Sequence, residues 1–166
     1  IMYVEATFNG AKTLIKLKKI KEANSLLDEV ILLSRTYEYK KIHSAALNSI
    51  GFIAFKENKL DKALTQTKKG LQISITLDDL KLQKESNHIL GLIYEALGLH
   101  ELQSKSLKSY ISLDNSLAKI EEERSYPEKE KAKQIIAEKD AIIENQESEL
   151  IEKKETTIFR KELHNY

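Results

Sequence analysis

The sequence predicts an all-α fold in which three antiparallel helix pairs are followed by one long, coiled-coil-like helix. Three observations lead to this fold class. The 166 residues include 5 glycines and 1 proline, while Lys, Leu, Glu and Ala, which favour helices, are abundant. A pattern of small and large apolar residues recurs along the chain at a fixed spacing. The last part of the chain is a long charged stretch that contains neither glycine nor proline after its start.

The repeat is clearest in residues 47–71, where Gly51 lies on one helix and Ala63 lies on the next, with a polar turn between them. A shift of 40 residues forward from Gly51 reaches Gly91, and the same shift backward reaches Ala11. Self-similarity at such a period indicates stacked two-helix units rather than one wrapped core.

The helices of these units follow from apolar spacing and from turn residues. Apolar residues at helical spacing, such as those from Leu26 to Ile31, predict helices that alternate with short polar turns. Asp78 and Asp79 interrupt the pattern and can cap the next helix, because a short carboxylate accepts the free N–H groups of a helix start. The predicted helices cover residues 3–17, 21–35, 39–57, 60–77, the stretch after Asp79 up to residue 97, and residues 100–123.

A new helix is predicted to begin near Pro127. Ser125 and Glu128 have the S-x-x-E spacing of a capping box, and proline is tolerated in the first helical turn. No residue interrupts the pattern up to Leu163, so this helix would be roughly 55 Å long at about 1.5 Å per residue. We therefore expect a helical repeat domain at 1–124, with repeats at about 1–38, 39–78 and 79–124, and a helical linker at 125–166.

One face of the long helix carries aliphatic residues at a seven-residue step, which predicts pairing with a second copy. Polar residues follow three positions later, where a strong coiled coil has Leu, so we expect a parallel homodimer at micromolar concentration. The alternative is a charged helix that lies along its own domain, since residues 121–166 carry a net charge of −4 and residues 1–120 carry +5. The predicted dimer face consists of Ile136, Ile142, Ile143, Leu150 and Ile151.

The order of residues within each unit resembles the tetratricopeptide repeat (TPR) over residues 1–120. In that family, small residues at Gly51 on the first helix and at Ala23 and Ala63 on the second let the two helices approach closely. Two positions depart from the pattern, because Ala11 replaces glycine and Gln103 stands where alanine is expected. The 40-residue period exceeds the usual 34 and resembles the long-repeat branch of bacterial regulators, such as response-regulator phosphatases and peptide-sensing transcription factors.

The resemblance implies that the first helix of each repeat forms the concave wall that holds a ligand. Aromatic residues beside Lys and Asn would suit an extended peptide, with its side chains on Phe52 and Phe55 and its backbone or carboxylate on Asn48, Lys12 and Lys56. The alternative is that Phe52 or Phe55 packs under the long helix or a missing repeat. The implied groove residues are Glu5, Phe8, Lys12, Ile15, Asn48, Phe52, Phe55, Lys56, His88, Leu92 and Glu95.

The sequence contains no recognisable motif for catalysis or for cofactor binding. It has no glycine-rich nucleotide loop and no H-E-x-x-H, and its 0 cysteines exclude a thiolate nucleophile and a disulfide framework. His43, His88 and His100 have no second ligand three or four residues away, so we expect structural or solvated roles and no metal. Basic residues are spread evenly, and we do not expect these residues to bind nucleic acid.

Three further expectations concern location and completeness. The chain has no apolar run of membrane-spanning length and does not begin with a signal-peptide pattern, which predicts a cytoplasmic protein without a membrane segment. It opens on Ile1, which suggests a fragment of a longer protein. The final helix resembles the linker that joins the last TPR of bacterial sensor proteins to an output domain.

The run R-K-E-L-H-N at residues 160–165 resembles the start of the phosphoacceptor box of some histidine kinases, with His164 as the candidate phosphoacceptor. The other interpretation is an exposed histidine at a helix end. We therefore expect a non-catalytic sensor or scaffold module of a bacterial signalling or transcription regulator, which binds a peptide or protein segment. The alternative is the sensor and phosphoacceptor half of a TPR-containing histidine kinase.

Overall fold

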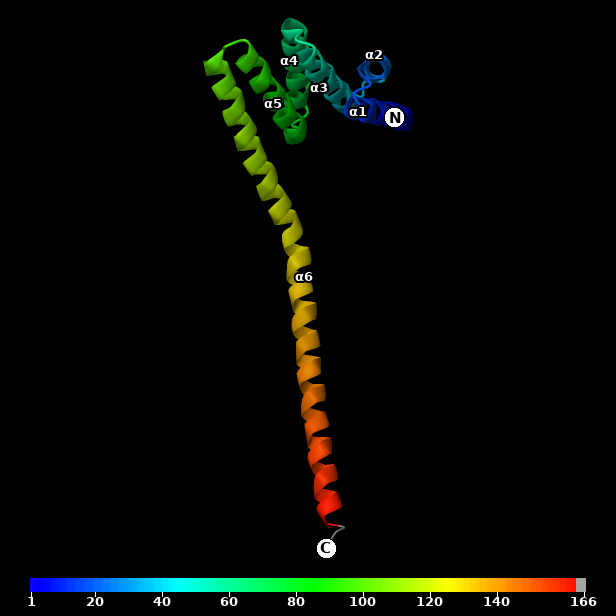
Figure 1. The fold of residues 1–166 in the computed structure, drawn as a ribbon, viewed down its shortest axis with the longest axis vertical. Helices are drawn as coiled ribbons and strands as arrows, with labels where there is room; N and C mark the ends of the chain where they lie inside the picture. The colour runs from blue at the N-terminus through cyan, green and yellow to red at the C-terminus, as the bar shows by residue number, and fades with distance from the viewer. Residues whose placement is uncertain (164–166) are drawn as a thin grey trace. The chain divides into compact units, whose positions relative to one another are not determined.

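In the computed structural model, the backbone of residues 1–163 and the side chains of residues 1–154 are described. Five short helices in antiparallel packing are followed by one long helix (Figure 1), which confirms the predicted fold class. Within the described residues there is no strand. The helices are α1 (Met2–Lys16), α2 (Ile20–Thr36), α3 (Lys40–Lys56), α4 (Leu60–Thr76), α5 (Leu80–Ala96) and α6 (His100–Leu163).

The turns between the helices share one geometry, and helices begin at residues 20, 40, 60, 80 and 100. In the turn after α3, the N–H of Asn58 donates to the carbonyl of Phe55 at 3.0 Å, and the N–H of Lys59 donates to the carbonyl of Ala54 at 2.8 Å. This pair of bonds is the Schellman motif, which ends a helix on a residue with left-handed backbone. The left-handed residues are Lys18, Glu38, Asn58, Asp78 and Gly98, with φ between 50° and 70°.

Helix α3 is at the centre of the array and contacts α1, α2, α4 and α5. Its residues take part in two clusters of buried apolar side chains. One cluster joins α1, α2 and α3 and includes Ala11, Leu27 and Ala46, each 0% exposed. The other joins α3, α4 and α5 and includes Ala63 and Ile93, also 0% exposed. Each helix pair therefore covers an apolar face of its neighbour, as expected of stacked units.

Small residues bring α3 and α4 together, as the repeat pattern predicts. A Cβ atom at Gly51 would lie 3.2 Å from the carbonyl oxygen of Ala63 and would overlap the hydroxyl group of Thr67. Ala63 and Thr67 are both 0% exposed. Only glycine therefore lets the two helices cross at this separation.

The third pair consists of α5 and the first part of α6. Lys84 Nζ lies 2.7 Å from Asp114 Oδ1, and the ring centroids of His88 and Tyr110 are 5.4 Å apart. His88 follows Lys84 in α5, whereas its partner Tyr110 precedes Asp114 in α6. The two helices therefore run antiparallel.

The helix boundary predicted at Ser125 is wrong. Helix α6 continues without a break from His100 to Leu163, with Pro127 inside it. Ser125 Oγ donates to the carbonyl of Glu122 at 3.0 Å, a bond made within a helix, so Ser125 does not cap one. A capping box needs a serine with non-helical backbone, and here helical residues lie on both sides. By its internal contacts the chain divides into two units, Ile1–Ala118 and the segment that begins at Lys119.

Candidate functional site

The predicted groove residues on α1, α3 and α5, which we call the first-helix surface, include pairs of aromatic rings and lysines. Lys12 Nζ lies 5.6 Å from the ring centroid of Phe8. Lys56 Nζ lies 5.3 Å from the ring centroid of Phe52 and 5.6 Å from that of Phe55. Both lysines are exposed and all three rings are partly buried. The structure thus places cations over aromatic faces, an arrangement stabilised by the ring quadrupole.

Phe52 and Phe55 also contribute to the core. Both rings pack against the apolar cluster that joins α3, α4 and α5, which includes Ala54, Ala63 and Ile89. Part of each ring is therefore already covered by the protein itself. Only the part that remains exposed is free to contact a ligand.

Asn48 does not lie on the exposed surface, contrary to the role that the resemblance implies for it. Its side chain is 0% exposed, and its Oδ1 accepts a hydrogen bond from Ser86 Oγ at 2.9 Å. A Cβ atom on Gly70 would come within 2.5 Å of the same Oδ1. Asn48 thus lies at the crossing of α3, α4 and α5, where it cannot hold a peptide backbone. Gly70 in the middle of a helix was a signal of this close crossing that the sequence reasoning did not use.

Glu85 on α5 belongs to the first-helix surface and was missed by the sequence reasoning. Burial raises the pKa of Glu85, while the charge of Lys12, the amide of Asn48 and the charge of His88 act in the opposite direction. By its accessible surface Glu85 is exposed, and Asn48 Nδ2 has no hydrogen-bond partner, so Glu85 is a surface carboxylate near charges of other first helices. The repeat could have identified Glu85 from the sequence, because Glu85 lies two 40-residue periods after the predicted groove residue Glu5 and so occupies the same position of its repeat.

The remaining groove residues differ in how much surface they offer. The ring of His88 lies against that of Tyr110 on α6, at a tilt of 39°. Leu92 and Ile15 are partly buried, whereas Glu5 and Glu95 are exposed.

Two hollows open between the second helices of adjacent pairs, and none of the predicted groove residues lines them. The α4–α6 groove is lined by α4, α5 and the first part of α6, and has a volume of about 690 Å³. The α2–α4 groove is lined by α2, α3 and α4, and has a volume of about 500 Å³. Each of the eight positions that line the smaller groove has a counterpart 40 residues later that lines the larger one. For example, Ile31 corresponds to Leu71, and Ile73 corresponds to Leu113. The grooves are therefore repeats of one structural feature.

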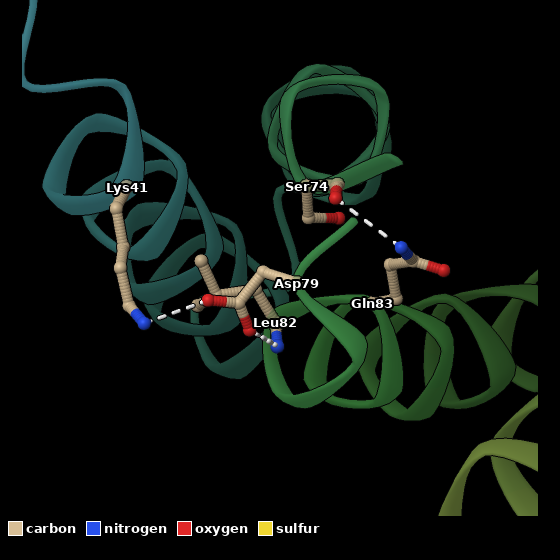
Figure 2. A network of polar contacts seen from close by, with 5 residues as sticks. All are labelled: Lys41, Ser74, Asp79, Leu82 and Gln83. Atoms are coloured by element: carbon tan, nitrogen blue, oxygen red, sulfur yellow. Dashed lines mark hydrogen bonds and ion pairs between the residues drawn. The ribbon is translucent and has the colours of Figure 1, made fainter. Parts of the chain in front are cut away.

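A polar network at the turn between α4 and α5 (Figure 2) includes Gln83, one of the residues that line the α4–α6 groove. Asp79 caps α5, as predicted, because its Oδ1 accepts from the N–H of Leu82 at 3.0 Å, and its Oδ2 lies 2.8 Å from Lys41 Nζ on α3. Gln83, which lines the groove, donates from Nε2 to the carbonyl of Ser74 at 3.2 Å. Partial burial works to raise the pKa of Asp79, but Lys41 and the N–H donors outweigh it and lower that pKa.

His43 occupies the corresponding place one repeat earlier. Its Nδ1 lies 2.9 Å from Ser34 Oγ, beside a hollow of about 290 Å³. Burial lowers the pKa of His43, and the nearby charge of Arg35 lowers it further. Ser34 is 1% exposed and so is not accessible as a nucleophile. The pair joins the end of α2 to α3, which is a structural role.

The aliphatic residues of the predicted dimer face are exposed in the second unit. Ile136, Ile142 and Ile143 are 59%, 55% and 53% exposed, and Leu150 and Ile151 are 56% and 58% exposed. His164 lies outside the described residues. Among residues with described side chains, no group of three His, Cys, Asp or Glu is arranged to hold a metal ion. None of the described helices has the length and apolar character needed to cross a membrane.

Comparisons with known proteins do not assign the chain to a family. No family model matches it. No similar curated protein was found either.

Proposed function

We propose that this chain is a non-catalytic interaction module that binds a peptide or protein segment on its first-helix surface. Its helix pairs act as a TPR-like scaffold in a bacterial cytoplasmic signalling or transcription regulator. The repeat pattern and the resemblance to long-repeat TPR regulators support this class. The stacked pairs expose a wide surface formed by several helices, which suits an extended ligand.

One observation carries the proposal. Lys12 Nζ lies 5.6 Å from the ring centroid of Phe8 on α1, and Lys56 Nζ lies 5.3 Å from that of Phe52 on α3. Two first helices therefore each present an exposed ammonium group beside a partly buried aromatic ring. The lysine-capped rings of Phe8, Phe52 and Phe55 belong to the same three-helix surface.

These groups match the chemistry of a short peptide. The partly exposed rings of Phe52 and Phe55 offer apolar contact, and the ammonium groups of Lys12 and Lys56 can pair with a carboxylate or with backbone carbonyls. Glu85 accepts hydrogen bonds and can receive a backbone N–H or a basic side chain. Asn48 is absent from this set because it is buried.

A peptide selection tests the proposal. Random short peptides displayed on phage would be selected against the full chain, and the enriched peptide would be titrated by fluorescence anisotropy. We expect the double variant Lys12→Ser/Lys56→Ser to bind about tenfold more weakly, because two charged contacts are lost. The matched control, Lys129→Ser/Lys131→Ser on the exposed part of α6, should bind like the unmodified chain. Failure to enrich any peptide, or equal losses in both variants, would contradict the proposal.

We also propose that the segment of α6 from Lys119 onward pairs with a second copy of the chain. Its support is the row of aliphatic residues, from Ile136 to Ile151, that are more than half exposed. Pairing would remove these side chains from water at roughly 1.5 kcal/mol or more for each one that is fully buried. Polar residues such as Lys139 and Gln146 within the same face would keep the dimer weak.

A further inference from the structure

We infer that the α4–α6 groove is a second docking surface, whose occupant is an acidic amphipathic helix of a partner protein. This surface lies between the second helices α4 and α6, over one side of α5, and shares no residue with the first-helix surface. The inference therefore does not rest on the proposed function.

The form of the groove suits a helix. Its walls are two second helices, α4 and the first part of α6, and α5 provides its floor. Because consecutive helices alternate in direction, the two walls run the same way and leave a channel between them. A helix that lies in such a channel packs its side-chain ridges against those of both walls.

Apolar side chains provide the contact surface within the channel. Leu71, Leu90 and Tyr94 line its inner part, and Ile75 and Leu102 reach its edges. Ile75 is 51% exposed and Leu102 is 42% exposed, so both present aliphatic surface to solvent. A partner with apolar residues at every third or fourth position would cover them.

The charges around the channel select an acidic partner. Three lysines, Lys68, Lys105 and Lys108, line it, and its fourteen lining residues, all within the described part of the chain, include neither Asp nor Glu. Lys68 Nζ lies 6.0 Å from the ring centroid of Tyr94, which holds one cation over the apolar floor. Carboxylates on the flanks of a docked helix would pair with these ammonium groups and set its orientation.

The preceding repeat shows that the basic character of this channel is a repeated feature. The smaller α2–α4 groove has Arg35 and Lys69 among its lining residues, and again has no acidic lining residue in the described chain. Lys68 and Lys69 are neighbours on α4 and line opposite grooves. The α4–α6 groove is the larger of the two and has three lysines where the smaller has one lysine and one arginine.

The probe for this inference is a fluorescein-labelled synthetic peptide with leucines on one helical face and glutamates on both flanks. A peptide of the same composition in scrambled order keeps the charge and loses the apolar face. A third peptide carries lysines in place of the glutamates. Each would be titrated by fluorescence anisotropy into the full chain and two variants, Lys105→Glu/Lys108→Glu in the groove and Lys12→Glu/Lys56→Glu on the first-helix surface.

We expect the acidic amphipathic peptide to bind the unmodified chain at least about tenfold more tightly than either control peptide, with affinity that falls as salt is added. The groove variant should lose about tenfold or more in affinity, and the first-helix variant should not change. A separate variant, Ile75→Gln, removes apolar contact without changing charge and should also weaken binding.

Four results would overturn the inference. They are no binding of the acidic peptide, equal binding of the scrambled peptide, equal loss in the first-helix variant, and a groove variant that changes the sedimentation of the protein alone. The last result would mean that a second copy of this chain covers the groove. Circular dichroism of each variant confirms that it remains helical before its affinity is measured.

Discussion

Replacing Gly51 with alanine adds one methyl group at the tightest crossing of α3 and α4. The new Cβ would lie 3.2 Å from the Ala63 carbonyl oxygen and 3.3 Å from the Thr67 backbone nitrogen, and it would overlap the Thr67 hydroxyl. The backbone atoms can give way only if α4 moves. Gly10→Ala is the matched control, because the nearest atom to its new Cβ is Leu26 Cδ1 at 3.4 Å, an ordinary contact.

The two variants should change stability in opposite directions. Alanine in an unobstructed helix stabilises by roughly 0.5–1 kcal/mol relative to glycine, so Gly10→Ala should raise the free energy of unfolding by about that amount. Overpacking costs about 1–3 kcal/mol, so Gly51→Ala should lower the free energy of unfolding by about 1–2 kcal/mol after the helix gain is subtracted. Gly51→Leu should lower it by more than about 2 kcal/mol.

Urea denaturation of the full chain, followed by far-UV circular dichroism, measures both changes. The Thr67→Ala background tests the mechanism, because Thr67 is 0% exposed and its Oγ1 has no hydrogen-bond partner. Without that hydroxyl, the cost of Gly51→Ala should shrink by about 1 kcal/mol. If Gly51→Ala proves as stabilising as Gly10→Ala, or if Thr67→Ala leaves its cost unchanged, the crossing does not require glycine and the packing argument is refuted.

Four other predictions concern assembly, capping and pH. In sedimentation velocity, the full chain should dimerise at micromolar concentration and a version truncated after Arg124 should not; identical behaviour of the two would exclude the long helix as the dimer element. Asp79→Ala should lower the free energy of unfolding by about 1–2 kcal/mol in urea, because it removes the α5 cap. Lys41→Ala, which keeps the cap, should cost less, and equal costs would disprove the capping role. Burial and Arg35 hold the pKa of His43 below its ordinary value, so the folded protein binds fewer protons and stability falls as pH decreases. Denaturation between about pH 5 and 7 should show a smaller loss in His43→Gln, and an unchanged slope would count against this. Burial raises the pKa of Glu85, so stability contributed by its protonated form is lost as pH rises through that pKa. Glu85→Gln should therefore be more stable than the unmodified chain at neutral pH, and a less stable variant would contradict the sign.

Local features of the sequence were sufficient to predict most of the helices. Five predicted helices match α1 to α5 within about two residues at each end, because helical periodicity and turn residues act over a few positions. The role of Asp79 as a cap was predictable for the same reason. The close approach of Gly51 to α4 was also predictable, because the repeat places small residues on both helices of a pair.

The sequence predicted the residues of the candidate sites less well than it predicted the helices. The first-helix surface stays a prediction, but Asn48, which was assigned to its exposed part, is buried, and Glu85 was overlooked. The grooves between second helices were not foreseen, although their eight repeated positions carry the same 40-residue period. A residue buried at a helix crossing and a residue exposed at a groove edge can occur in the same local sequence pattern. The sequence alone therefore does not distinguish them.

By itself, the sequence determined the helical class, the 40-residue unit and the positions of the turns, because each depends on residues close together in the chain. Tertiary structure decided three other features. It buried Asn48 among three helices, paired Lys41 of α3 with the Asp79 cap of α5, and opened a basic channel between α4 and α6. It also gave one continuous helix through Pro127 where a local capping pattern predicts a new start. Burial and the meeting of distant charges depend on which helices pack together, and that packing is a non-local property of the folded chain.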